Sequence, residues 1–260
     1  MQDFFIKFLV CLAAGLIAGV GTGLSGLSAA AIISPILIMF LGMDADMSLG
    51  IALASDILAS SISAYTYAKN DNIDIKSGRI VLVTALIFTM VGSRAGTYIP
   101  QNTMGSFSLI MMTVRGIKFI CKPVMAIKED DADTPRWQRI GQLIFCGIII
   151  GFVCGFVGPG GGMLRLWLLT SILGYELKTA VGTGTFIMAF TAFVGANSHF
   201  MLLETAWDFG ALFWCILFTF IGARFSAKFA NKASPVTLNR VAGFVLTFLG
   251  ILMFVVKGFQ

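Results

Sequence analysis

The sequence GPGGGMLRLWLLTSILGYELKTAVGTG, residues 158–184, joins a run of glycines to two apolar stretches and contains one arginine, Arg165. Consecutive glycines and a proline disfavour continuous helix, because each glycine costs about 1 kcal/mol and proline removes a backbone donor. The apolar stretch at residues 163–173 would be about 16 Å long as a helix, whereas a hydrocarbon core is about 30 Å thick. We therefore predict that the chain breaks at residues 158–162 inside a membrane and continues as a short helix.

The composition of the whole chain agrees with a membrane location. Of its 260 residues, 57% are hydrophobic and only 12% are charged, whereas about 25% of residues in soluble domains are charged. The mean hydropathy is +0.91. This excludes a soluble globule and predicts a multi-pass membrane protein whose partner is the lipid bilayer. The net charge of +5 lies in short loops between apolar stretches, so it indicates topology and no nucleic-acid partner.

Charged residues, glycine, proline and asparagine divide the chain into ten hydrophobic segments. Two of them, 28–41 and 163–173, are short, and a third contains Arg115 and Lys118, which weaken it as a full span. The sequence thus predicts an all-α integral membrane protein. Its expected segments are 4–21, 28–41, 48–68, 78–99, 104–120, 137–157, 163–173, 179–200, 208–229 and 237–256.

The ten segments fall into two similar halves. A shift of 136 residues places Gly15 on Gly151, Gly19 on Gly155 and Gly26 on Gly162. After a four-residue gap, a shift of 132 places residues 41–44, LGMD, on residues 173–176, LGYE. The alternative to an internal repeat is that glycines match by chance in a chain that is rich in glycine. We predict two five-segment repeats with Gly-rich helix breaks, 1–121 and 137–260, joined by a cytoplasmic linker at 122–136.

The loop charges orient the two repeats. Thirteen of the eighteen Lys and Arg residues lie in residues 69–79, 115–139 and 224–240. The turns between them carry Asp44 and Asp46, or Glu204 and Asp208, and no Lys or Arg. Basic loops are cytoplasmic, so the first segment starts outside and the sixth starts inside. The five-segment repeats are therefore inverted, an arrangement typical of secondary transporters with a substrate site near the bilayer midplane.

Irregular backbone inside a membrane points to an anion site, because the free amides at a helix N-terminus bind anions. Arg165 adds to this indication, because an arginine within the membrane is usually functional. Three structural alternatives stay open: turns outside the membrane, an Arg165 side chain that reaches the interface, and simple small-residue helix packing at residues 181–185. The candidate substrate ligands are Thr22, Gly23 and Ser25 in the break at 21–28, Gly160, Gly161 and Gly162, Arg165, and Thr183 and Thr185.

Asp56 is the candidate coupling residue. It lies about 12 Å into its predicted segment and shares a small, polar helix face with Ala52, Ser55, Ser60 and Ser63. We hypothesise that it responds to protons when a cavity opens to either side. The alternative is a structural hydrogen bond or an ion pair, with Arg165 or Arg94 as partner.

The paired Gly-rich breaks, GPGGGMLRL followed by LGYE and VGTGT, and a repeat over nearly the whole chain resemble the TauE/SafE family of sulfite exporters. The first half departs from the pattern, because residues 22–25, TGLS, replace the glycine run. The resemblance implies a carrier in the bacterial inner membrane for sulfite, organosulfonates or similar small organic anions. The resemblance leaves open the direction of transport and the coupling ion. It also leaves open the oligomeric state, for which a homodimer is one option.

Two other functions compete with a transporter. Residues 23–26, GLSG, match the G-x-S-G of rhomboid proteases, with Ser25 as nucleophile and His199 as base. The motif lies in the first helix break and His199 near a helix end, so we do not expect an enzyme. An anion channel is the third option, although inverted repeats favour alternating access. No ATP, dinucleotide or zinc motif is present and the five cysteines are scattered, so no cofactor or metal is predicted.

Overall fold

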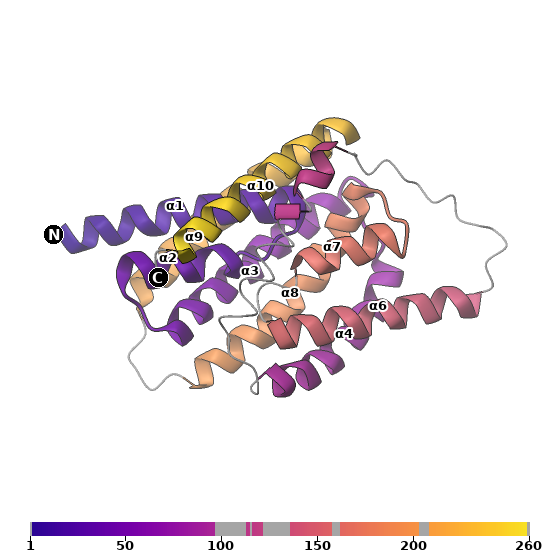
Figure 1. Cartoon of the computed structure of the whole chain (residues 1–260), viewed down its shortest axis with the longest axis horizontal. Helices are drawn as coiled ribbons and strands as arrows, with labels where there is room; N and C mark the ends of the chain where they lie inside the picture. Colours follow the sequence, from indigo (N-terminus) through magenta and orange to yellow (C-terminus); the bar gives the residue numbers. More distant parts are fainter. Residues whose placement is uncertain are drawn as a thin grey trace.

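The part of the chain that the computed structural model describes, residues 2–96, 113–114, 116–121, 136–157, 162–202 and 208–258, forms helices joined by turns and contains no strand. This confirms the all-α prediction. Figure 1 shows the helices α1 (Gln2–Ser25), α2 (Ala30–Leu41), α3 (Ala45–Ala68), α4 (Ile75–Gly96), α6 (Arg136–Val157), α7 (Gly162–Ser171), α8 (Leu177–Leu202), α9 (Phe209–Lys232) and α10 (Pro235–Gly258).

Six of these helices, α1, α3, α4, α6, α8 and α9, are long and apolar enough to cross a membrane. Two others are much shorter, with 12 residues in α2 and 10 in α7. They coincide with the short segments expected after each helix break. Most of the fifth predicted segment, 104–120, lies outside the described residues, and the ten-segment inverted repeat stays a prediction.

The first helix break is shorter than the sequence suggested. We expected irregular backbone over residues 21–28, but α1 continues through Ser25 and only residues 26–29 interrupt the helices. Gly26 ends α1 with a φ of +66°, and its N–H bonds the Thr22 carbonyl at 2.9 Å. This is a left-handed helix cap, for which glycine is the favoured residue. The prediction that residues 21–25 are not helical was therefore wrong.

The glycines of α1 have another role, which explains why the helix tolerates them. Gly15, Gly19 and Gly23 are four residues apart and face α9. A Cβ atom on Gly19 would overlap the carbonyl oxygen of Thr219, and one on Gly23 would overlap the Ser226 side chain. Small residues at this spacing let two membrane helices approach closely. They therefore join α1 to α9.

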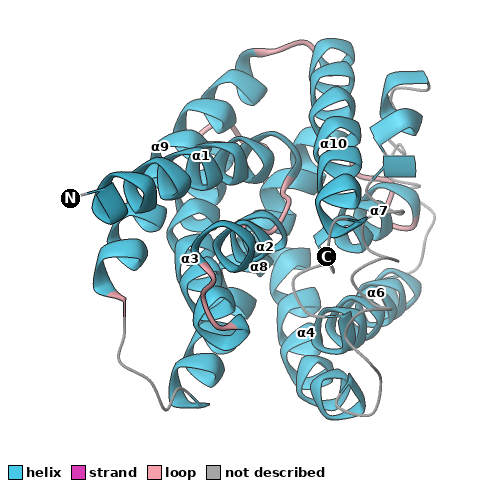
Figure 2. Ribbon diagram, turned by 60° about the vertical axis from the view of Figure 1, so that its left-hand side comes forward, coloured by secondary structure: helices cyan, strands magenta, loops and turns pink. Residues whose placement is uncertain are grey.

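Helix pairing links the two halves of the chain. Helix α1 packs along α9, α4 packs along α6, and α3 contacts both α8 and α9, as Figure 2 shows from a second direction. Glycine again lies at the α4–α6 contact, where a Cβ on Gly151 would overlap the backbone of Ala85. Each half thus contributes its first helix to a close contact with the fourth helix of the other half.

Replacing Gly19 with alanine should destabilise the protein. The new methyl group has no space against the Thr219 carbonyl, and overpacking costs about 1–3 kcal/mol. Gly141→Ala on α6 is the matched control, because a Cβ there meets nothing within 4 Å. In thermal unfolding of the purified protein, the midpoint should fall for Gly19→Ala and stay level or rise for Gly141→Ala. The reverse order would contradict close packing of α1 on α9.

The two turns that the sequence alignment paired have the same backbone conformation. Gly42 follows α2 with a φ of +61°, and Gly174 follows α7 with a φ of +67°. The Gly42 N–H bonds the Ile38 carbonyl at 3.0 Å. Both short helices therefore end at a left-handed glycine before the next long helix begins.

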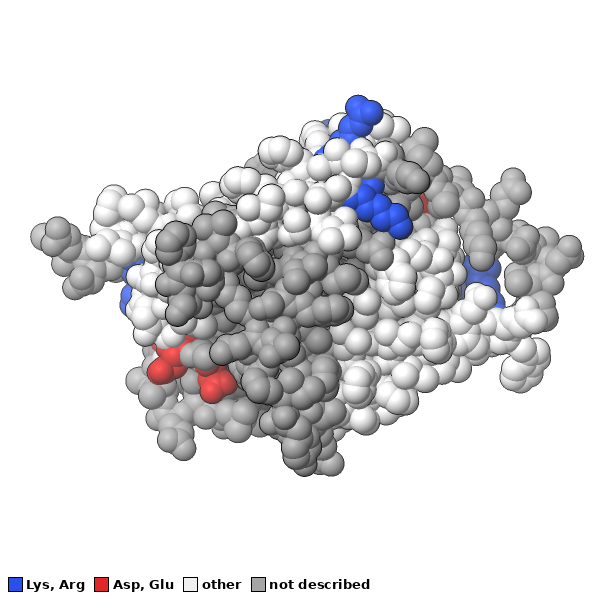
Figure 3. All heavy atoms as spheres, in the orientation of Figure 1, with Lys and Arg blue, Asp and Glu red and all other residues white. Residues whose placement is uncertain are grey.

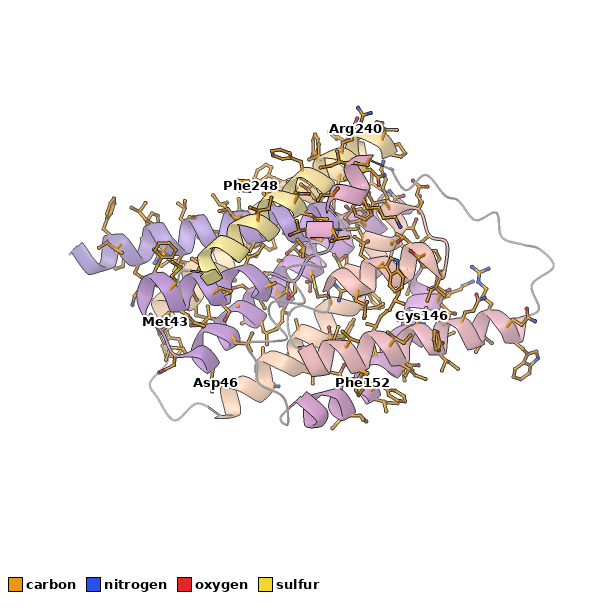
Figure 4. All side chains as sticks on the ribbon, in the orientation of Figure 1. Met43, Asp46, Cys146, Phe152, Arg240 and Phe248 are labelled. Carbon is orange, nitrogen blue, oxygen red and sulfur yellow. The ribbon has the colours of Figure 1, made fainter. Side chains whose placement is uncertain are left out.

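Opposite ends of the bundle carry different polar contacts. At one end, Lys7 at the start of α1 pairs with Asp208, which also caps α9 by accepting the Ala211 N–H at 3.0 Å. At the other end, Asn231 of α9 accepts hydrogen bonds from Asn72 at 2.8 Å and from Lys178 at 3.0 Å. Figure 4 places Asp46 at the lower left of the bundle and Arg240 at its top. On the face in Figure 3, most visible basic side chains lie away from the acidic ones.

Candidate functional site

The first helix break lies level with the middle of α3. Asp56, the twelfth of the 24 residues of α3, is fully buried. Its carboxylate accepts a hydrogen bond from the Ser28 hydroxyl at 2.6 Å and one from the Ala29 N–H at 3.0 Å. The Ser60 hydroxyl is a more distant donor, at 3.4 Å. A break in this position requires protein partners for its backbone groups, because the bilayer interior offers none.

Asp56 supplies the N-terminal cap of α2. The cap residue Ala29 has no side chain that can accept a hydrogen bond. The carboxylate reaches it from α3, and a negative charge is stabilising next to the positive end of a helix dipole. The structural alternative for Asp56, a buried hydrogen-bonded group, is therefore present in the fold, whatever further role the residue has.

The carbonyl side of the same break has different partners. Nη2 of Arg165, on α7, donates to the Gly26 carbonyl at 3.0 Å, and the Tyr67 hydroxyl donates to the Gly23 carbonyl at 2.9 Å. Arg165 is only 3% exposed, so its side chain points into the protein and does not reach for the membrane surface. Within the described residues, Arg165 and Asp56 form no ion pair, since each binds its own side of the break.

The guanidinium of Arg165 retains hydrogen-bonding capacity. Both of its contacts, to Gly26 and to the Met188 sulfur at 2.9 Å, involve Nη2. Neither Nε nor Nη1 has a hydrogen-bond partner among the residues that the structure describes, which leaves three of the five guanidinium N–H groups available. Gly184 provides space here, because a Cβ on it would lie 3.3 Å from Nε.

Three of the predicted hydroxyl ligands bond their own helices. Thr22 donates to the Ala18 carbonyl at 3.0 Å, Ser25 to the Gly21 carbonyl at 2.8 Å, and Thr185 to the Gly182 carbonyl at 2.9 Å. A hydroxyl has one hydrogen, so these groups accept hydrogen bonds in this arrangement and do not donate to an anion. Gly23 lies inside α1, where it packs on α9.

Thr183 lies apart from the first break. Its hydroxyl accepts the backbone N–H of Asp74 at 3.0 Å, in the connection between α3 and α4. The carboxylate of Asp74 accepts bonds from Tyr175 at 2.8 Å and from the Ser77 N–H at 3.0 Å. Partial burial alone would raise the pKa of Asp74, but the bonds from Ser77 and Tyr175 and the charge of Arg139 hold it below its ordinary value. Asp74 is therefore ionised at neutral pH.

The contacts of Tyr67 and Asp74 were not expected from the sequence. The spacing of Asp74 and Ser77 is that of a helix cap, and the start of α4 at Ile75 could have been inferred from it. No comparable signal identifies Tyr67, whose partner Gly23 is 44 residues earlier in the chain.

The remaining predicted site residues lie at the edge of the described structure. Gly162 is the first residue of α7, while Gly160 and Gly161 lie outside the described residues. The side chains of Arg94 and His199 lie outside them as well. The neighbours of Gly26 on α8 are Val181 and Thr185, about 20 Å along that helix from residue 199. The end of α1 therefore lies next to a part of α8 that is distant from residue 199.

An apolar groove of about 620 Å³ lies between α3 and α8 on the surface of the bundle. Its walls include Ile57 and Tyr65 of α3 and Phe186 and Phe193 of α8. Tyr65 and Phe193 are exposed, as expected of side chains that face lipid. Such a lining does not suit an anion, so the Arg165 region is the better candidate site.

Comparisons with known proteins agree with this architecture. The sulfite exporter TauE/SafE family matches residues 11–253. The chain is 24% identical over 267 residues to the probable membrane transporter protein YunE of Bacillus subtilis, with 94% of this chain and 96% of YunE covered. It is 23% identical to the probable membrane transporter protein MJ0441 of Methanocaldococcus jannaschii, with 96% and 97% covered. The chain belongs to the sulfite exporter TauE/SafE family.

Proposed function

We propose that the protein is a secondary transporter that moves a small anion, such as sulfite or an organosulfonate, across the bacterial inner membrane. The observation that carries this proposal is a buried arginine at a helix break, with Nε and Nη1 free of partners among the described residues. The names of the family and of the similar proteins support transport as the activity.

The chemistry of Arg165 fits an oxyanion. Its planar fork matches two oxygens of a carboxylate, sulfite or sulfonate, whereas a halide offers only one contact point. The N-terminus of α7 begins three residues earlier at Gly162, and it adds positive potential without a further buried charge. In this proposal the amides of Gly160 to Gly162 and the Arg165 fork hold the anion.

The paired helix contacts support alternating access by two inverted repeats. Close contacts join α1 to α9 and α6 to α4, as a two-fold relation between the halves would require. Aligned glycines, Gly15 and Gly151, lie in the corresponding contacts. Movement of one repeat against the other around the break would open the site to each side in turn.

Asp56 and Arg165 give this movement a route for proton coupling. An anion on Arg165 competes with the Gly26 carbonyl for the guanidinium. Protonation of Asp56 removes the charge from its hydrogen bonds to Ser28 and Ala29, and such bonds are about half as strong when neutral. Substrate and proton thus act on opposite sides of one break: the substrate weakens the contact at the end of α1, and the proton weakens the contact at the start of α2.

The proposed orientation places the Lys7–Asp208 end of the bundle outside and the Asn231 end in the cytoplasm. The motivation is the positive-inside partition of the loop charges. Single cysteines at residues 128 and 204 of a Cys-less variant, treated with an impermeant thiol reagent on intact cells, should react only at 204. Labelling at 128 would contradict the orientation.

Flux in liposomes tests the function directly. The purified protein should accelerate uptake of sulfite or a sulfonate, with saturation by substrate and acceleration by an opposing anion gradient. Exchange of this kind distinguishes a carrier from a channel. Liposomes that hold the Arg165→Ala variant should be no faster than empty ones. If none of sulfite, sulfate, sulfonates and carboxylates is transported or raises the thermal stability of the protein, the proposal fails.

A further inference from the structure

The two halves differ in charge at corresponding positions of their helix breaks. The shift of 136 that places Gly26 on Gly162 also places Ala29 on Arg165, and the shift of 132 places Asp56 on Met188. Asp56 is the twelfth residue of α3, and Met188 is the twelfth residue of α8. The first half thus has a carboxylate where the second half has a thioether.

Within each half, the two aligned positions are in contact: Asp56 with Ala29 in the first half, and Met188 with Arg165 in the second. Asp56 accepts the N–H of Ala29 at 3.0 Å, and the Met188 sulfur contacts Nη2 of Arg165 at 2.9 Å. The side chains of Asp56, Arg165 and Met188 are all buried, with exposed fractions of 0%, 3% and 3%. In each half, the middle of the long third helix therefore meets the beginning of the short second helix.

The chain neutralises one of these helix beginnings and leaves the other positive. At α2 the Asp56 carboxylate and the Ser28 hydroxyl complete a hydrogen-bonded cap. At α7 the thioether of Met188 carries no charge, and Ser60, which supports Asp56, corresponds to Ala192. Nε and Nη1 of Arg165 have no partner among the described residues. The charge of Asp56 acts on Arg165 from a distance, but the two form no ion pair among the described residues, so the guanidinium fork can still take an anionic ligand.

We infer that Asp56 fills the anion position of the first break with the chain's own carboxylate, and that Met188 keeps the corresponding position of the second break open. Met188 is then a specificity-determining residue, and each chain binds one anion, at Arg165. This inference rests on the proposed function.

The decisive variant places a carboxylate at the second position. The Asp side chain in Met188→Asp should pair with Arg165 and occupy the anion site from within. Met188→Asn is the matched comparison, because it has nearly the same shape and no charge. In calorimetric titrations with sulfite, sulfate, sulfonates and carboxylates, each anion that the wild type binds should bind Met188→Asp at least 100-fold more weakly than the wild type. Each such anion should also bind Met188→Asp at least tenfold more weakly than Met188→Asn. Equal affinity of the two variants would overturn the inference.

The reverse variant empties the first position. In Asp56→Ala the cap of α2 lacks its carboxylate, so formate or acetate should raise the midpoint of thermal unfolding more than it does for the wild type. If Asp56→Ala does not fold, the Asp56→Asn variant, which keeps an oxygen for Ala29, should show no such selective rise. The assignment would be contradicted if formate or acetate raised the unfolding midpoint of Asp56→Ala no more than that of the wild type. It would also be contradicted if they raised the midpoint of Asp56→Asn more than that of the wild type.

The stoichiometry separates this inference from the proposed function. One anion per wild-type chain is expected, and two would overturn the inference while leaving transport intact. If the wild type binds none of the anions, the proposed function fails first. Folded Met188→Asp should unfold at a temperature no lower than Met188→Asn, because the new carboxylate forms a charge-assisted pair with the Arg165 guanidinium. A folded Met188→Asp that unfolds well below Met188→Asn would contradict the pairing with Arg165.

Discussion

Arg165→Lys is expected to weaken anion binding at least tenfold, although the charge is kept. Lysine offers a point charge on a flexible stem, so it loses the two-pronged contact to an oxyanion and the bond to the Gly26 carbonyl that fixes the fork. Tenfold corresponds to about 1.4 kcal/mol. Calorimetry or the ligand-induced rise in thermal stability measures this affinity in the purified protein.

The matched control for this substitution is Arg224→Lys on α9. Arg224 is exposed on the surface of the bundle, far along the chain from either helix break. It should bind the anion as the wild type does. If Arg165→Lys and Arg224→Lys both keep the wild-type affinity within about twofold, or ~0.4 kcal/mol, the site lies elsewhere.

The second large effect is expected for Asp56→Asn. The amide oxygen can still accept the Ala29 N–H, so the variant should fold, but the side chain no longer gains or loses a proton. Uptake driven by a pH gradient should therefore fall at least tenfold, while exchange of labelled for unlabelled anion continues. Both fluxes are measured on the same liposomes.

Asp71→Asn serves as the control for Asp56. Asp71 lies in the exposed turn after α3 with a φ of +57°, a conformation that asparagine adopts as readily as aspartate. Its flux should keep the pH dependence of the wild type. An Asp56→Asn variant that transports with unchanged pH dependence would leave Asp56 with only its structural role at the start of α2.

The sequence was a good guide wherever composition or spacing determines the outcome. Short helices after two glycine-containing breaks follow from segment length, and a similar turn at Gly42 and at Gly174 follows from the aligned LGMD and LGYE motifs. The end of α1 was misjudged because the same property, a missing side chain, permits both a helix break and close helix packing. The four-residue spacing of Gly15, Gly19 and Gly23 favoured packing, but it identifies no partner helix.

Contacts between distant residues were beyond reach for a different reason. Arg165 could be recognised as an arginine within the membrane and as a candidate ligand, but its partner Gly26 is 139 residues earlier. The hydroxyls of Thr22 and Ser25 could be identified as polar, but their hydrogens had two competing acceptors, the backbone of their own helix and a ligand. The α-helix supplies a carbonyl four residues back at the right distance, so the local bond forms.

The contact of α1 with α9 also determines when the protein can be assembled. Lys7 and Asp208 are 201 residues apart, and ribosomes add about 5–20 residues per second. The first helix therefore waits about 10–40 s in the translocation machinery or the lipid before its packing partner emerges. Until then the glycine face of α1 has no partner from α9, and the same applies to α4 until α6 is made. The two halves of the chain are consequently not separate units of folding, and neither half is expected to form a stable protein when synthesised alone.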